Sequence, residues 1–183
     1  MFRGFIAVEV EVTGEIKSFM EDLKRSNAKI KLVEPENLHL TLKFLGDTRE
    51  DKIEEITSII EESSKGVKPF EITLEKTGVF PNPSSMRVIW IGVTGGEKLK
   101  TIADKLDEKL VKLGYKRESR GFKPHLTVAR VKNPGDKNKI KPILEKYKDT
   151  CFGRTKIEEI HLKKSTLTSS GPIYTTLREV KLE

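Results

Sequence analysis

The 183-residue sequence predicts an α+β fold in which antiparallel strands are backed by helices. Segments of apolar residues alternating at period two predict half-buried strands, and segments with apolar residues three and four apart predict amphipathic helices. The strands arrive in pairs between helices, which favours α+β over a doubly wound parallel sheet. No low-complexity linker divides the chain, so we expect a single domain over residues 1–183.

The first half predicts strands over residues 5–10, 38–45 and 70–79 and a helix over 15–27. Thr48 and Asp51 have the spacing of a capping box, which predicts that the next helix begins there. The apolar face of that helix consists of Ile53, Ile56, Ile59 and Ile60.

The second half predicts a central strand over residues 86–93, because that segment is apolar on both faces. Thr94 and Glu97 form a second capping box, which opens a helix to about Leu113. The glycines between them lack the spacing of a phosphate-binding loop. The remaining predicted elements are strands over 125–131, 156–168 and 174–182 and a short basic helix around 143–144.

The composition favours an anionic partner, and its single cysteine indicates either a reducing compartment or indifference to the redox state of the compartment. Thirty-five Lys and Arg against 28 Asp and Glu give a formal charge of +7, which favours phosphates, although many proteins without nucleic-acid roles are basic. The single cysteine, Cys151, excludes an intramolecular disulfide. The N-terminal apolar run is too short for a signal peptide, and no stretch could span a membrane. We therefore expect a cytoplasmic protein with no membrane partner.

The chemistry is concentrated in a repeated tetrapeptide. His39-Leu40-Thr41-Leu42 and His125-Leu126-Thr127-Val128 use two of the three histidines in the chain. In a strand, residues i and i+2 share a face, so each segment places one imidazole and one hydroxyl together while the aliphatic residues anchor it from behind.

Two such strands are suited to cleaving a phosphodiester by acid–base catalysis. One imidazole can take a proton from the attacking water and the other can give one to the leaving oxygen. Thr41 and Thr127 could bind the non-bridging oxygens. A single His-x-Thr segment is ordinarily structural, but its repetition indicates function. The histidines could instead ligate a metal, but a catalytic zinc usually needs three protein ligands and no ligand motif supplies them, so we expect neither metal nor cofactor.

The segments around the two histidines resemble a known family. Glu36–Gly46 (ENLHLTLKFLG) and Phe122–Arg130 (FKPHLTVAR) are similar to the two motifs of the two-histidine phosphoesterase superfamily. Within it they resemble the RNA 2′,3′-cyclic phosphodiesterases, historically named 2′-5′ RNA ligases. The strands around Arg3–Ala7 and Arg87–Val93 also look familial, so the similarity spans most of the chain.

The resemblance implies a bilobal fold with a pseudo-two-fold axis, each lobe an antiparallel sheet backed by helices around a central cleft. It implies hydrolysis of a terminal 2′,3′-cyclic phosphate to a 2′-phosphate, with reversible 2′-5′ ligation reported for some members. His39 would donate a proton to the leaving 3′-oxygen and His125 would activate water. The expected partner is RNA with a cyclic phosphate terminus, tRNA-like fragments included, and we expect a monomer.

Four further residues are secondary candidates for substrate binding. Strand alternation puts Lys43 on the face of Thr41, where it could neutralise phosphate, although a solvated strand-end lysine fits as well. Arg130 matches a basic position of the family, but strict alternation sends it to the opposite face unless a bulge intervenes. Phe5 and Phe122 could stack a terminal base, with core packing as the alternative.

His161 serves as a comparison with His39 and His125, because no threonine follows it at i+2, and we expect it to be solvated and non-catalytic.

Two other functions of the protein stay open. The basic helix could make the protein an RNA-binding module without chemistry, although the expected aromatic and Gly-x-x-Gly motifs are missing. The substrate could also be a small cyclic nucleotide or a 2′,5′-oligoadenylate.

Overall fold

The fold is built from four α-helices, nine strands and four short 3-10 turns, and the computed structural model describes all of residues 1–183. In chain order the helices and strands are β1 (Phe2–Glu9), α1 (Gly14–Arg25), β2 (Ile30–Leu32), β3 (His39–Thr48), α2 (Ile53–Ser64), β4 (Phe70–Asn82), β5 (Ser85–Thr94), α3 (Glu97–Leu110), β6 (His125–Val131), α4 (Lys137–Tyr147), β7 (Cys151–Ile157), β8 (Glu159–Thr168) and β9 (Gly171–Lys181).

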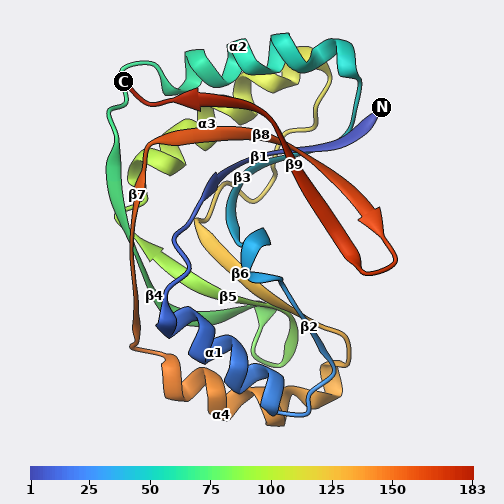
Figure 1. The fold of residues 1–183 in the computed structure, drawn as a ribbon, viewed down its shortest axis with the longest axis vertical. Coiled ribbons are helices and arrows are strands. Elements are labelled where there is room, and N and C mark those ends of the chain that lie inside the picture. The colour runs from blue at the N-terminus through green and yellow to red at the C-terminus, as the bar shows by residue number, and fades with distance from the viewer.

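The strands form two antiparallel sheets, which confirms the α+β prediction. The first sheet has the order β3-β1-β8-β9 and the second has the order β2-β6-β5-β4-β7. Figure 1 shows α2 and α3 at one end of the molecule, over the first sheet, and α1 and α4 at the other end, beneath the second sheet. Each sheet therefore has one face packed on helices and one face, here called its open face, turned toward the middle of the molecule.

The helices follow the apolar spacing that predicts them. In α1, Ile16, Phe19, Met20 and Leu23 form a buried stripe, and the hydroxyl of Thr13 accepts a hydrogen bond from the Ile16 N–H. Both predicted capping boxes are wrong. Thr48 is instead the buried last residue of β3, and the hydroxyl of Thr94 donates to Glu75.

One long predicted strand is divided between the sheets. The sequence predicts a continuous strand over 156–168, but β7 ends at Ile157 in the second sheet and β8 begins at Glu159 in the first. This crossover joins the two halves of the fold. No helix in the protein is both long enough and apolar enough to cross a membrane.

The two histidine strands carry the same irregularity. Along β3, Leu42 has no partner in the ladder with β1, because Ala7 pairs with Thr41 and Ile6 pairs with Lys43. Along β6, Val128 is the unpaired residue in the ladder with β5. Each β-bulge lies three residues after the histidine and reverses the alternation of the side chains that follow. The residue five positions after each histidine, Phe44 or Arg130, therefore returns to the open face.

Candidate active site

The imidazoles of His39 and His125 are held in the same way. Nδ1 of His39 lies 2.7 Å from the carbonyl oxygen of Asn37, and Nδ1 of His125 lies 2.7 Å from the carbonyl oxygen of Lys123. Because a carbonyl only accepts, Nδ1 is the protonated nitrogen in each neutral ring. Nε2 is left as the nitrogen available for proton transfer in both histidines.

Aromatic side chains surround each imidazole. The ring of His39 lies 4.9 Å from that of Phe5 and 5.3 Å from that of Tyr174, measured between centroids. The ring of His125 meets the ring of Phe80 edge-on at 5.0 Å. These rings come from β1, β9 and β4, so the sheets as a whole, rather than the motif strands alone, form the surroundings of each histidine.

The surroundings lower the pKa of both histidines. Burial is the largest cause for His39, and the positive charge of Lys163 acts in the same direction. Burial also lowers the pKa of His125, and Arg130 adds to that effect, while the hydrogen bond to Lys123 opposes it. Both imidazoles are therefore neutral near pH 7 in the free protein, and a bound anion would favour their protonation.

The two threonines lie on the open face but differ in their contacts. The hydroxyl of Thr41 lies 2.9 Å from Nε2 of His39 and donates to it, since that nitrogen carries no proton in the neutral ring. Thr127 is half-buried opposite Trp90 and makes no hydrogen bond to His125. Of the two catalytic candidates, His125 is therefore the one whose Nε2 makes no hydrogen bond.

The charge of Arg130 acts on residues of both open faces. Arg130 could reach the face of His125 only if a bulge interrupted the strand, and the bulge at Val128 does so. It places Arg130 on the same side as His125 and Thr127. Burial raises the pKa of Tyr174, and the charge of Arg130 opposes that shift. The charge of Arg130 also lowers the pKa of His125, so it acts on a residue of the second sheet and on one that packs on His39. The strands β3 and β6 themselves are in contact near the centre of Figure 1.

The predicted placement of Lys43 on the face of Thr41 is wrong. The bulge at Leu42 turns Lys43 away from Thr41, and its side chain is buried on the helix side of the sheet. Its ammonium donates to Asp107 of α3 at 2.5 Å and to the carbonyl of Lys116 at 2.6 Å. Burial would raise the pKa of Asp107, but the hydrogen bonds from Lys43 and from the Glu118 N–H outweigh it and hold that pKa low. Lys43 is a structural ion-pair residue.

The two phenylalanines considered for base stacking differ in burial. Phe5 is 4% exposed and forms the floor beneath His39. Phe122 is half-buried and packs against the hydrophobic core, so its stacking role stays a prediction.

His161 is buried rather than solvated, which corrects the expectation. It is 6% exposed, its Nε2 lies 3.1 Å from Glu159, and its Nδ1 lies 3.4 Å from Glu9. Glu9 also accepts a hydrogen bond from Lys163 at 2.7 Å and pairs in register with His39.

The sequence analysis missed three residues near the histidines. Strand alternation could have indicated Lys163 as a residue of the open face, since it shares a face with His161. No local signal marks Tyr174 or Phe80, which reach the histidines through the strand order of each sheet.

One cluster has the composition of a cation site. Ligand atoms of Glu159, His161 and Glu179 lie within 4.8 Å of one another, across the pairing of β8 with β9. Two carboxylates and an imidazole could hold a divalent transition metal. Neither His39 nor His125 belongs to this cluster.

Two antiparallel sheets, each contributing a His-x-Thr strand with the same bulge, define a two-histidine phosphoesterase. Residues 5–182 match the family described as the AKAP7 2′5′ RNA ligase-like domain, and the chain belongs to it. A protein of Methanothermobacter thermautotrophicus named RNA 2′,3′-cyclic phosphodiesterase is 39% identical over 182 residues, 98% of each chain. One of the same name from Methanocaldococcus jannaschii is 44% identical over 179 residues, 97% of this chain and 99% of its own.

Solved structures have the same fold. TT0787 of Thermus thermophilus superposes with a TM-score of 0.77 at 27% identity, covering 98% of this chain and 97% of its own. E. coli LigT complexed with 3′-AMP superposes with a TM-score of 0.72 at 22% identity, covering 99% and 98%. The predicted family is confirmed.

Proposed function

We propose that the protein hydrolyses 2′,3′-cyclic phosphates at the ends of RNA. The observation that carries this proposal is the shared geometry of His39 and His125, whose Nδ1 atoms are both engaged by carbonyls while Nε2 is available for proton transfer. The two relatives that align over nearly their whole length are named for this activity.

In the proposed mechanism His125 takes the proton from water and His39 gives one to the leaving 3′-oxygen. The free Nε2 of His125 suits the base, because no hydroxyl competes for its lone pair. Water attacks phosphorus in line with the bond that breaks. Thr41, Thr127 and Arg130 bind the non-bridging oxygens, and their hydroxyls and guanidinium stabilise the charge of the transition state. The reaction needs no metal in this scheme.

The same site could run in reverse and join RNA ends through a 2′-5′ linkage, with the two histidines exchanging roles. Because each sheet supplies one histidine, we also propose that residues 1–183 act as one bilobal domain and as a monomer.

The test is incubation with a short RNA that ends in a 2′,3′-cyclic phosphate, followed by phosphorus NMR of the product. We expect a 2′-phosphate, since an asymmetric site presents only one ester oxygen to His39. A 3′-phosphate would overturn the assignment of roles, and an unchanged RNA would overturn the proposed function. Hydrolysis of a cyclic mononucleotide or a 2′,5′-oligoadenylate with no reaction on RNA would favour the small-molecule alternative.

A further inference from the structure

Phe44 is an exposed aromatic side chain on the open face of the first sheet. The bulge at Leu42 returns it to the side of His39, and it is 69% exposed. It pairs in register with Phe5, whose ring packs on His39. Phe44 lies four ladder positions beyond His39, roughly 13 Å along the strand, which places it past a nucleotide whose phosphate is at His39.

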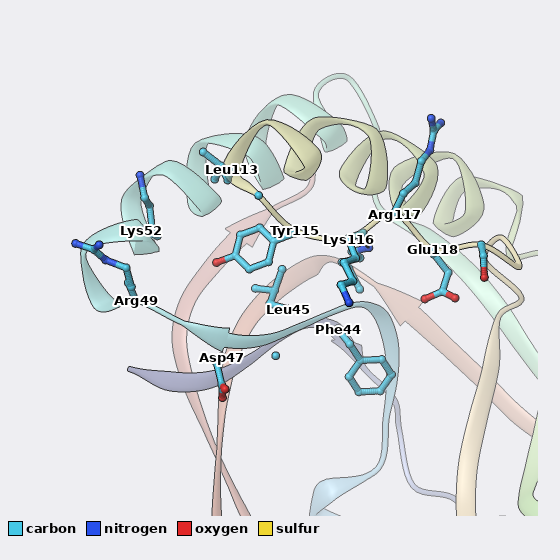
Figure 2. Close-up of a pocket in the computed structure, with 14 residues that line it drawn as sticks. Phe44, Leu45, Asp47, Arg49, Lys52, Leu113, Tyr115, Lys116, Arg117 and Glu118 are labelled. Atoms are coloured by element: carbon cyan, nitrogen blue, oxygen red, sulfur yellow. Dashed lines mark hydrogen bonds between the residues drawn. The ribbon is translucent and has the colours of Figure 1, made fainter.

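A hollow of about 610 Å³ lies beside Phe44. Its walls are the end of β3 and the segment after α3, including Lys116, Arg117 and Glu118 (Figure 2). Figure 2 shows the ring of Phe44 projecting from β3 on the side away from the two helices. The Phe44 ring therefore faces the open side of β3 at the rim of the hollow, and the charged side chains of Lys116, Arg117 and Glu118 line its wall.

The wall belongs to a basic segment, residues 115–124, that runs from the hollow to His125. It carries four cations and one acid, and of the cations only Arg117 forms an ion pair, at 3.6 Å from Asp107. Lys116, Arg120 and Lys123 are exposed and have no carboxylate partner. Unpaired cations beside a phosphodiesterase site suit the phosphates of a bound strand.

The basic segment is held in place from beneath. Lys43 donates to the carbonyl of Lys116, and the carboxylate of Asp107 accepts from the Glu118 N–H at 2.9 and 3.1 Å. The Lys43–Asp107 pair thus holds the backbone of Lys116 and Glu118 in place before any ligand binds, which lowers the cost of ordering that part of the segment.

We propose that Phe44 and the basic segment form a subsite for the single-stranded nucleotides that precede the cyclic end of the RNA. This inference rests on the proposed function and assigns its substrate as a strand rather than a mononucleotide. Phe44 stacks one base, while Lys116, Arg120 and Lys123 bind the phosphates that follow. Stacking on an aromatic ring with cations along the backbone is the mode by which proteins bind single strands with little sequence preference.

The test compares Phe44→Ala with wild type on two substrates, a ten-nucleotide RNA with a cyclic phosphate end and a 2′,3′-cyclic mononucleotide. We expect the ratio of kcat/KM for RNA to that for mononucleotide to fall about 5- to 150-fold, carried by KM. Phe44→Trp should restore the ratio. Ile173→Ala is the matched control, because Ile173 is 56% exposed and precedes Tyr174 on the opposite face of β9. An equal loss on both substrates, or none on RNA, would overturn the subsite.

A binding measurement separates this inference from the proposed function. Fluorescence anisotropy with the labelled RNA needs no turnover, and we expect Phe44→Ala to weaken binding by the same factor. Changing Lys116, Arg120 and Lys123 to Gln should lower the slope of log affinity against log salt by about 0.7 for each lost phosphate contact. Unchanged RNA affinity in these variants would refute the subsite, whereas a wild-type protein that binds RNA without hydrolysing it would refute only the proposed function.

Discussion

His39 and His125, 86 residues apart, each direct Nδ1 at a carbonyl oxygen two residues earlier in the chain, at the same distance of 2.7 Å. Each histidine is the first residue of its strand, so the residue two positions earlier lies outside the strand and its carbonyl oxygen can accept from the ring. The same tautomer is thereby imposed on both rings. The difference between them lies in Nε2, which meets the Thr41 hydroxyl in His39 and is free in His125.

Replacing either histidine should remove most of the activity. We expect His39→Ala and His125→Ala each to lower kcat by about 10²–10⁴-fold, the usual contribution of one acid–base group. Initial rates on RNA with a cyclic phosphate end measure the effect. His161→Gln is the control, because His161 is also buried on the open face but its imidazole lies beside the carboxylates of Glu159 and Glu9 and belongs to neither His-x-Thr motif. A comparable loss in His161→Gln, with circular dichroism unchanged, would show that the site is misplaced.

The pH dependence should be shifted toward acid. Activity requires His125 neutral and His39 protonated, so kcat/KM rises through the pKa of the base and falls through that of the acid. Because the pKa of each histidine is lowered, the maximum of kcat/KM should lie below about pH 6.5.

A charge change should move one limb of that profile. Lys163 lowers the pKa of His39, so Lys163→Met should raise it and move the falling limb to higher pH. The measurement is kcat/KM from about pH 4 to about pH 9, a range that extends well to either side of the ordinary pKa of histidine. An unmoved falling limb would contradict the role of Lys163 in setting the protonation of His39.

Activity should survive exhaustive treatment with EDTA, since neither catalytic histidine belongs to the one cluster that could hold a cation. Rates before and after chelation provide the measurement, with Glu179→Gln as a variant that removes one ligand of that cluster. Loss of activity restored by a single divalent ion would support a catalytic metal.

Lys43 should matter for stability. Lys43→Met removes the ammonium from Asp107, which is 14% exposed and keeps its contacts with the Glu118 N–H and with Arg117, so the free energy of unfolding should fall by up to about 3 kcal/mol, the lower end of the range for breaking a buried pair. Denaturant unfolding measures this change. Lys100→Met, which breaks the exposed pair with Asp104, should cost less than about 1 kcal/mol. If Lys43→Met/Asp107→Leu is no more stable than Lys43→Met alone, the uncompensated carboxylate is not the cause.

The pairing of imidazole with hydroxyl could be predicted from sequence because it is local. Side chains at i and i+2 of a strand share a face whatever the strand pairs with, so His39 with Thr41 and His125 with Thr127 needed no knowledge of the sheet. Most strands and helices followed from periodicity and the family from the two motifs, whereas β2 was not predicted and the strand over 156–168 is divided between the sheets.

The positions after each motif depend on pairing between strands. Lys43 and Arg130 each lie on the opposite face of the sheet from the one that strict alternation predicts. The bulge at Leu42 buries the lysine, and the bulge at Val128 exposes the arginine. A bulge is a mismatch between two strands, and a single strand carries no record of where its partner lacks a residue. Tyr174 and Phe80 reach the histidines for the same reason, since strand order brings together residues that are far apart in the chain.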